Sequence, residues 1–482
     1  MRAKLSGLAV LLSMALALGT ATDSFAQETA PAGGEGNAAA GGQGSAPASG
    51  QGSAPAGGQG IASAGGPGIV PTGEYKEGIP LGSWMLYPTL FVGAVYNSNV
   101  SQLTTTDNGT DLRVVPRLVG TYDGGIHKSV VYGVVDAEFL TYNNVAANVG
   151  FANTYEAMRD LVFNYYGNYT RETSIFNSAV NFNNGAIGPP GTPAGTIPIV
   201  INPFGTTPTV NPIAYNQFTA GGSVTKTFNQ ALFASLGVTA FYILFDQPTD
   251  IPQPFQTSEN GASIWVTGRV GYNVIPQLYV FAEGDGIFQR FANSVFNTDG
   301  YRVMGGLGTS DPNSLIRGEI YGGYQAQQQL AEEPFGTPSI PLLLPSGIPT
   351  LVSSGVYGGR ISYYPTQYWT LIGSVDQVLG ISTQLSPGVP EGLPSKVTTA
   401  LVQTNYAFAH NWWVGARGGY TEGYYFGLFP QNHGLLAGAS FNYEIWRNLL
   451  MTLDYQFTTL RSDLTVANFN QHTVTAGVTY RY

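Results

Sequence analysis

Apolar and polar residues alternate with a period of two from Leu86 to the end of this 482-residue chain. In the last segment, Val474 and Val478 fall on one face of an extended chain, whereas Thr475 and Thr479 fall on the other. A period of two is typical of a β-strand with one apolar face, whereas the apolar residues of an amphipathic helix recur about every 3.6 residues. A chain that repeats such a face in strand after strand must cover it with a second layer or with lipid.

The alternation predicts eighteen strands separated by turn-forming residues. They cover residues 86–97, 110–122, 128–142, 154–167, 170–183, 214–227, 231–245, 259–272, 277–291, 299–309, 314–328, 351–363, 368–381, 395–408, 412–425, 433–445, 448–461 and 469–482. Short turns, one of them at Asn168–Tyr169, alternate with longer connections, of which 184–213, 329–350 and 382–394 are rich in Pro and Gly. This alternation in an even-stranded antiparallel sheet is typical of outer-membrane barrels, whose short turns and termini are periplasmic.

A soluble β-sandwich is the alternative fold for such a chain, but its exposed strand faces would be polar and its surface more charged. Charged residues make up only 10% of this sequence and aromatic residues 12%. Lipid contact explains both values, because a closed barrel satisfies all its backbone groups in hydrocarbon. The predicted fold class is therefore all-β, a transmembrane antiparallel up-and-down barrel of about eighteen strands, preceded by a disordered segment.

The N-terminus resembles a secretory signal peptide over residues 1–26. Arg2 and Lys4 are followed by the apolar stretch Leu5–Leu18 and by Ser24-Phe25-Ala26, which suits cleavage. A membrane anchor is the alternative, although the stretch is shorter than the ~20 residues that a helical span needs.

Residues 27–70 consist mainly of Gly, Ala, Ser, Pro and Gln and contain a short repeat. Too few apolar side chains are present to offset the entropy of ordering, so a disordered periplasmic linker is predicted. A spacer is the simplest role, and a tether that reaches through the cell wall is the alternative. Residues 71–85 are taken as a lead-in and 86–482 as the outer-membrane barrel.

Most tryptophans lie beside predicted short turns, where a periplasmic interface girdle is expected. Trp369, Trp412, Trp413 and Trp446 flank short turns and Trp84 precedes the first strand, whereas Trp265 lies elsewhere. Pro88 and Pro116 are a mild contradiction of the strand interpretation, because each removes a ladder donor; they lie in the first two strands, where a bulge could accommodate them.

Strand parity assigns most charged residues of the barrel to the inward face. The lumen-facing candidates are Arg113, Arg117, Asp136, Glu138, Arg269, Glu283, Asp285, Arg302, Arg317, Glu319, Arg360, Asp376, Arg417, Glu444 and Asp454, with Arg481 as a further basic position. These charges either pair across neighbouring strands and support the wall, or line a water-filled pathway for a polar solute of low charge such as a saccharide. On the second interpretation, Tyr279 and Tyr321 could stack on sugar rings. Loop 184–213 carries no charge, which disfavours strong ion selectivity.

Several classes of chemistry are disfavoured. There is no Cys, which excludes disulfides and thiolate sites, and the net charge of −10 argues against nucleic acid. The four histidines, His127, His410, His433 and His472, show no metal-ligand spacing. His127 and His410 are expected to have turn or interface roles. No metal, no cofactor and no enzymatic activity are predicted; a hydrolase whose groups meet only in space is the alternative.

The C-terminal strand ends in an aromatic residue. Val478, Tyr480 and Tyr482 share its lipid-facing side and are predicted to form the assembly signal for the barrel assembly machinery. Outer-membrane lipid is the second expected partner.

Several short motifs occur in a characteristic order. They are Tyr96-Asn97-Ser98-Asn99-Val100 after Pro88, Tyr169-Thr170-Arg171, Gly271-Tyr272-Asn273 through Pro276, Phe281-Ala282-Glu283-Gly284, Arg447-Asn448-Leu449 and Thr479-Tyr480-Arg481-Tyr482. From about residue 86 to the end, the chain resembles the putative β-barrel porin 2 family of Gram-negative outer-membrane proteins, although family members usually end in Phe. The Thr-Arg pair resembles a recurring turn of that family. The resemblance implies an outer-membrane barrel, and some members are associated with exopolysaccharide export.

The leading functional hypothesis is a porin-like channel in the outer membrane of a Gram-negative bacterium, serving as the port for exopolysaccharide export together with periplasmic polysaccharide-export components. A small-solute diffusion porin is one alternative. A non-transporting structural or adhesive surface barrel is the other.

Overall fold

The computed structural model describes only part of the chain. The described residues are 78–99, 108–139, 144–176, 208–229, 231–245, 260–275, 277–292, 297–309, 314–330, 351–366, 368–381, 394–426, 431–462 and 468–482. The predicted signal peptide 1–26 and linker 27–70 lie outside them, as does most of the three Pro/Gly-rich connections.

The described residues form nineteen β-strands. Their bounds are β1 (Ile79–Leu81), β2 (Trp84–Asn97), β3 (Gly109–Asp123), β4 (His127–Phe139), β5 (Asn144–Met158), β6 (Leu161–Phe176), β7 (Pro208–Phe228), β8 (Leu232–Phe245), β9 (Gly261–Ile275), β10 (Leu278–Phe291), β11 (Thr298–Thr309), β12 (Ile316–Gln329), β13 (Leu351–Thr366), β14 (Trp369–Ile381), β15 (Pro394–Ala409), β16 (Trp412–Tyr425), β17 (Gln431–Trp446), β18 (Leu449–Ser462) and β19 (Phe469–Arg481). None of the described residues belongs to a helix long and apolar enough to cross a membrane.

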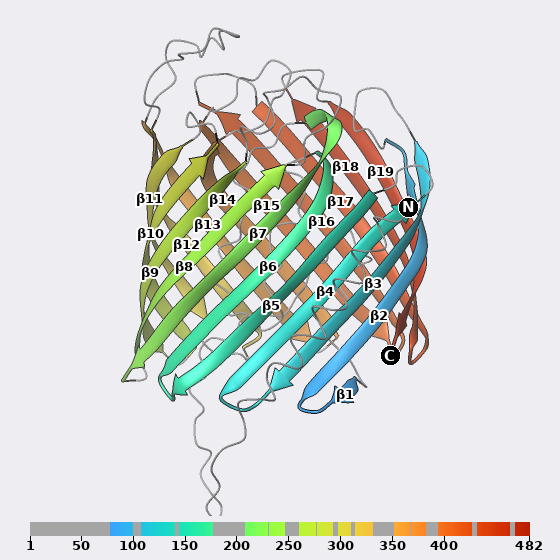
Figure 1. Ribbon diagram of the computed structural model, residues 1–482, viewed down its shortest axis with the longest axis horizontal. Helices are drawn as coiled ribbons and strands as arrows, with labels where there is room; N and C mark the ends of the chain where they lie inside the picture. Colours follow the sequence, from blue (N-terminus) through green and yellow to red (C-terminus); the bar gives the residue numbers. More distant parts are fainter. Residues whose placement is uncertain are drawn as a thin grey trace, which may run out of the picture. The chain divides into compact units, whose positions relative to one another are not determined.

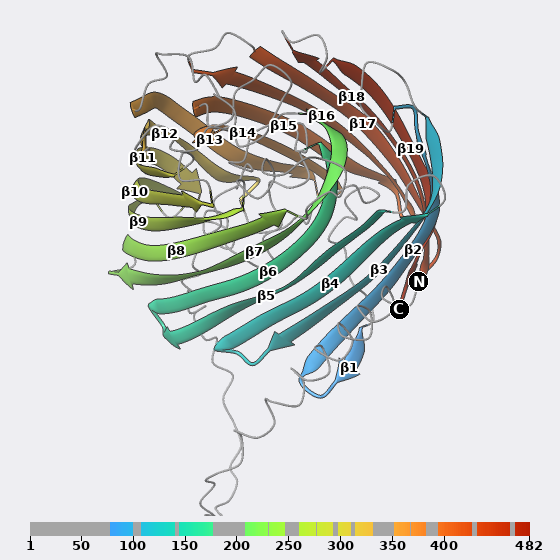
Figure 2. The ribbon, with the colours of Figure 1, turned by 45° about the horizontal axis from the view of Figure 1, so that its top comes forward.

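Strands β2 to β19 follow one another in sequence order, each antiparallel to the next (Figure 1). The last strand returns to the first, with Val478 opposite Val92 and Ala476 opposite Ala94. This pairing closes the sheet into a ring, as Figure 2 shows. Closure leaves no long unpaired edge, which is the condition for a sheet to stand in hydrocarbon. The predicted fold class, a closed antiparallel barrel of eighteen strands, is confirmed.

The nineteenth strand, β1, has a local role. Strand β19 covers β2 only as far as Thr89, which lies opposite Arg481. Beyond that point β1 takes over, with Ile79 opposite Leu86 and Leu81 opposite Trp84. Since the other edge of β2 is paired with β3 throughout, β1 continues the line of β19 along the same edge. This short strand lies in the segment expected to be a lead-in, and the barrel itself begins at Trp84.

The two faces of the sheet differ in character. On β10, Tyr279 and Glu283 are buried, whereas Val280 and Phe288 are exposed. Exposed large apolar side chains recur with this parity around the sheet, among them Leu90, Val92, Phe151, Val238, Val270, Val303, Ile320, Tyr357, Val402, Leu435, Leu453 and Tyr480. We call the side that bears them the outer face, because an apolar band suits lipid, and the opposite side the inner face.

One region of the predicted strand pattern was wrong. Strands were expected at 154–167 and 170–183 with a turn at Asn168–Tyr169, but β5 and β6 meet at Arg159–Asp160. Gly167 and Asn168 resemble a turn, yet both lie inside β6 and pair on either side. The Tyr169-Thr170-Arg171 motif therefore lies within a strand too. The true turn is held by Asp160, whose carboxylate pairs with Lys226 Nζ, and this hydrogen bond lowers the pKa of Asp160.

The prolines cause less disturbance than expected. Pro88 and Pro116 face the outer side, and β2 and β3 stay in register past both of them. The ladder between β3 and β4 lacks two pairs between Val114 and Arg117, and it resumes in the same register. The predicted bulge is therefore wrong at this site: the sheet tolerates the missing donor as a gap.

Aromatic rings form a row near the short turns on the outer face. Trp84, Tyr122, His127, Tyr155 and Phe163 follow one another across β2 to β6 with centroid separations of 5.5, 5.8, 6.3 and 6.5 Å. A second group surrounds Trp412, whose ring lies 4.4 Å from that of Tyr443 and 5.0 Å from that of Phe441. This arrangement suits an interface girdle at that end of the barrel, but the prediction was wrong for Trp413, which is buried on the inner face opposite Asn442.

Candidate functional site

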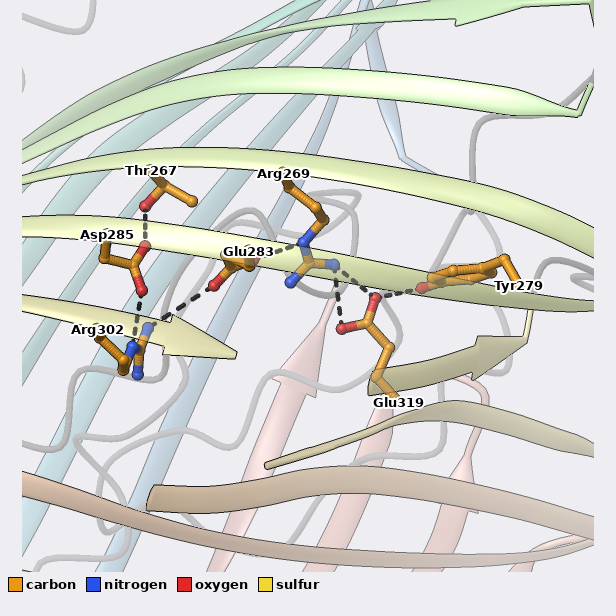
Figure 3. Close-up of polar contacts among 7 residues, drawn as sticks. All are labelled: Thr267, Arg269, Tyr279, Glu283, Asp285, Arg302 and Glu319. Atoms are coloured by element: carbon orange, nitrogen blue, oxygen red, sulfur yellow. Dashed lines mark hydrogen bonds and ion pairs between the residues drawn. The ribbon is translucent and has the colours of Figure 1, made fainter. Parts of the chain in front are cut away.

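The strand register groups the predicted lumen-facing charges on the inner face. Arg269 lies opposite Glu283, and Asp285 lies opposite Arg302. Arg113 lies opposite Glu138 on the neighbouring strand. The wall formed by β9 to β12 holds the densest group, a network of seven residues: Thr267, Arg269, Tyr279, Glu283, Asp285, Arg302 and Glu319 (Figure 3).

Arg269 forms the first half of this network. Its Nε donates to Glu283 Oε2 at 2.5 Å, and its Nη1 donates to both Glu319 oxygens at 2.9 and 3.2 Å. The Tyr279 hydroxyl donates to the same Glu319 carboxylate. The guanidinium also lies 4.2 Å above the Phe281 ring. One arginine on β9 thus binds carboxylates on β10 and β12.

Arg302 forms the second half. Its Nε donates to Asp285 Oδ2 at 2.7 Å, and its Nη2 lies 3.8 Å from Glu283 Oε1. Thr267 donates to the other Asp285 oxygen at 2.7 Å. The guanidinium also sits 5.3 Å above the ring of Trp265, the one tryptophan that the girdle interpretation left unplaced. Glu283 therefore joins the two arginines into one network.

The charged side chains of the network are at most 13% exposed, and that of Asp285 is 0% exposed. Burying a charge is costly unless a partner and hydrogen bonds compensate it. Each arginine here meets at least two carboxylates, so the network is stabilised as a unit. Three carboxylates face two guanidinium groups, which gives a formal excess of one negative charge.

Glycine allows the tyrosines to reach across a strand. Tyr279 on β10 passes over Gly308 on β11 to reach Glu319 on β12, and the three residues lie in register. A Cβ built on Gly308 would collide with the Tyr279 ring. The same arrangement recurs where Tyr321 donates to Asp376 Oδ1 at 2.7 Å across Gly358.

A third case places Tyr166 over Gly221, with its hydroxyl 2.9 Å from Thr239 Oγ1. These hydroxyls are committed to the wall. Tyr279 is only 2% exposed, so its ring cannot stack on a sugar, contrary to the suggestion from sequence. The glycines were missed at the sequence level because each partner lies on a different strand.

Two further arginines form ion pairs elsewhere on the inner face. Arg113 Nε donates to Asp136 Oδ1 at 2.8 Å and lies 3.8 Å from Glu138 Oε1. Arg417 binds both Asp454 oxygens at 2.8 Å. It also donates to Gln456 at 3.0 Å. Ten of the fifteen predicted lumen-facing charges are thus in ion pairs.

The other five predicted positions have different surroundings. Arg317 stacks 4.5 Å from the Tyr364 ring and donates to the Ser314 carbonyl. Asp376 accepts the Tyr321 hydroxyl. Within the described part of the chain, Arg117, Arg360 and Glu444 form no ion pair, and Arg117 Nε has no hydrogen-bond acceptor.

The predicted assembly residues Val478, Tyr480 and Tyr482 are all exposed at the end of the chain. Val478 lies opposite Val92, and Tyr480 lies opposite Leu90. Both partners are exposed apolar residues of the outer face. The closing seam of the barrel is therefore apolar on its outer face.

Across the residues that the structure describes, no group of three or more His, Asp or Glu side chains is placed to hold a metal ion. The geometry instead defines a closed antiparallel barrel with an apolar outside and a paired-charge inside, which is the class of porin-like outer-membrane β-barrels.

The sequence agrees with this class. The family model for putative beta-barrel porin 2 matches residues 201–336 and 357–482, and the chain belongs to that family. No curated protein sequence matches the chain.

Solved structures give only distant likenesses. The anion-selective porin from Comamonas acidovorans is 12% identical, with 83% of this chain and 99% of that one covered and a TM-score of 0.34. Pseudomonas aeruginosa OpdK with vanillate is 8% identical, with 82% and 99% covered and a TM-score of 0.40. The siderophore receptor PirA from Pseudomonas aeruginosa is 8% identical, with 82% and 80% covered and a TM-score of 0.37.

Proposed function

We propose that this protein is a channel in the outer membrane of a Gram-negative bacterium for polar solutes of low net charge. The main support for this proposal is the pairing of arginines with carboxylates on the inner face. Each paired guanidinium has a carboxylate within 4 Å, and the fifteen predicted lumen-facing positions, seven Arg and eight Asp or Glu, together carry a formal charge of only −1. Rings of uncompensated charge, by contrast, are what make a pore select ions.

The neutral inner-face residues favour a saccharide as the solute. Partly exposed amide and hydroxyl side chains accompany the ion pairs on this face, among them Asn168, Gln217, Thr219, Gln403 and Asn405. Such groups both donate and accept hydrogen bonds, as sugar hydroxyls do. Export of an exopolysaccharide, with periplasmic export components as partners, is the physiological form that we propose. A small-solute diffusion porin is the alternative.

The N-terminal segments belong to the same proposal. The signal peptide 1–26 would direct export, and the linker 27–70 would remain in the periplasm as a spacer. The barrel assembly machinery would recognise the C-terminal strand. Outer-membrane lipid would cover the apolar outer face.

Permeation into proteoliposomes tests the proposal. Purified full-length protein is reconstituted, and swelling is followed in isosmotic neutral disaccharide, in a dicarboxylate and in a diamine. We expect the disaccharide to enter at least as fast as either ion. Faster entry of one ion alone would contradict the low-charge pathway, and no entry of any solute would favour the structural or adhesive barrel.

Size dependence separates export from diffusion. A polysaccharide port is expected to admit a neutral oligosaccharide of ten or so units, whereas a diffusion porin should exclude it and still pass the disaccharide. The matched variants are Arg417→Gln, which leaves Asp454 unpaired on the inner face, and Arg461→Gln on the outer face. Only Arg417→Gln should favour the diamine.

A further inference from the structure

Charged side chains interrupt the apolar outer face at the end of the barrel that carries the long connections. Lys396 on β15, Glu422 on β16 and Arg461 on β18 all lie within a few residues of those strand ends. His433 on β17 lies between Glu422 and Arg461 in register. Arg461 shares the strand parity of the exposed Leu453, so it points outward. We call Lys396, Glu422, His433, Arg461 and Asn470 the rim patch.

Arg461 is the strongest charge of this patch. Its Nη2 donates to Asn470 Oδ1 at 2.8 Å, and its Nη1 donates to the carbonyls of Leu460 and Phe469 at 3.1 and 3.3 Å. None of these acceptors is ionised. Lys396 likewise lies over an uncharged group, 5.8 Å from the Tyr424 ring. Glu422 is the acid of the patch, and no ion pair joins it to either cation among the described residues.

Arg290 provides an internal comparison. It occupies the equivalent place at the same end of β10, and it donates to the carbonyls of Gln289 and Thr298 at 2.9 and 3.0 Å. Its third acceptor is Asp299 Oδ1 at 2.7 Å, where Arg461 has Asn470. In each case the acceptor lies on the next strand, opposite the residue two positions before the arginine. Asp299 lies opposite Phe288, and Asn470 lies opposite Thr459. The two sites therefore differ in the charge of one side chain: among the described residues, Arg290 has a carboxylate partner and Arg461 has none.

We propose that the rim patch binds the phosphate of an anionic lipid in the outer leaflet, an inference that rests on the proposed outer-membrane location. A guanidinium held by neutral acceptors retains its attraction for phosphate, which it binds through charge-assisted hydrogen bonds. Basic residues at a membrane interface attract anionic headgroups in this way. Apolar residues of the outer face continue directly from the patch, with Leu435 and Leu453 exposed, so acyl chains and headgroup would be held by one surface.

Lipid binding to the detergent-solubilised full chain tests this inference. Native mass spectrometry would compare a diphosphorylated glycolipid with the same lipid lacking phosphates. The phosphorylated lipid should bind wild-type protein about tenfold more tightly, and Arg461→Gln should remove most of that preference. Arg290→Gln should not change it, because Asp299 already compensates that charge.

Exchanging the acceptor side chains at positions 470 and 299 tests whether the charge of the acceptor determines lipid binding. Asn470→Asp should weaken binding as Arg461→Gln does, and Asp299→Asn should create a second phosphate-dependent lipid site. Equal binding of both lipids, or equal losses in Arg461→Gln and Arg290→Gln, would overturn the inference. Competition by inorganic phosphate at the lipid's own concentration would also overturn it, since the site would then bind free phosphate. All variants should still pass the disaccharide, so failure here is distinct from failure of the channel.

Discussion

At the scale of single residues, the inner wall depends on contacts that cross an intervening strand. Tyr279 meets Glu319 only because Gly308 between them has no side chain. Arg269 makes a longer crossing, from β9 past β10 and β11 to Glu319 on β12. Such contacts tie three or four strands together, beyond the backbone ladder of each neighbouring pair.

Replacing Gly308 by alanine should destabilise the barrel. The new methyl group would push the Tyr279 ring away and break its hydrogen bond to Glu319, which we expect to lower the free energy of unfolding by about 1–3 kcal/mol. Urea unfolding in detergent micelles measures this change. Gly284→Ala is the matched control, because a Cβ there meets no atom within 4 Å. Equal stabilities of the two variants would contradict the crossing.

Removing Arg302 should have a larger effect at neutral pH. Arg302→Met leaves the buried Asp285 carboxylate without its cation, which typically costs about 3–5 kcal/mol. The exposed pair Arg290–Asp299 has the same 2.7 Å separation, yet its side chains are 48% and 40% exposed. Arg290→Met should therefore cost less than about 1 kcal/mol. If both variants unfold at the same urea concentration, burial does not govern the strength of these pairs.

At the scale of elements, period-two alternation was enough to predict the barrel strands, because each strand has one face toward lipid. It failed at β5 and β6, where Gly167 and Asn168 resemble a turn but pairing with both neighbours keeps them extended. Pairing also determines β1, whose three residues are too few to show a pattern. The same limit applies to the inner-face charges. The alternation along each strand predicted which charges share a face, but only the register between neighbouring strands determines which of them pair.

Deleting residues 469–482 should prevent assembly. The deletion removes β19 and leaves β2 and β18 with unpaired edges in hydrocarbon, where each unsatisfied backbone group costs several kcal/mol. That total exceeds the roughly 5–15 kcal/mol net stability of a typical domain. Heat-modifiable migration in gels reports assembly. Tyr482→Phe should assemble normally and Tyr482→Asp slowly. A truncated chain that still shifts on heating would disprove closure by β19.

At the scale of the whole molecule, two surfaces with opposite chemistry share one sheet. The outer face repeats exposed apolar side chains from strand to strand, and the inner face holds arginines and carboxylates in pairs. A barrel of about 16–18 strands can enclose an aqueous pathway. The paired charges of the inner face support the proposed channel, which would have little preference for the sign of charge.

Planar-bilayer recording of the full-length protein tests the proposed low charge selectivity. The protein is first shown to be folded by its heat-modifiable migration, and currents are then recorded across a tenfold KCl gradient. We expect discrete current steps with a reversal potential near zero, which moves toward cation selectivity in Arg417→Gln and not in Arg461→Gln. A folded protein that gives no current, or a reversal potential close to the limit for a purely cation- or anion-selective pore, would contradict it.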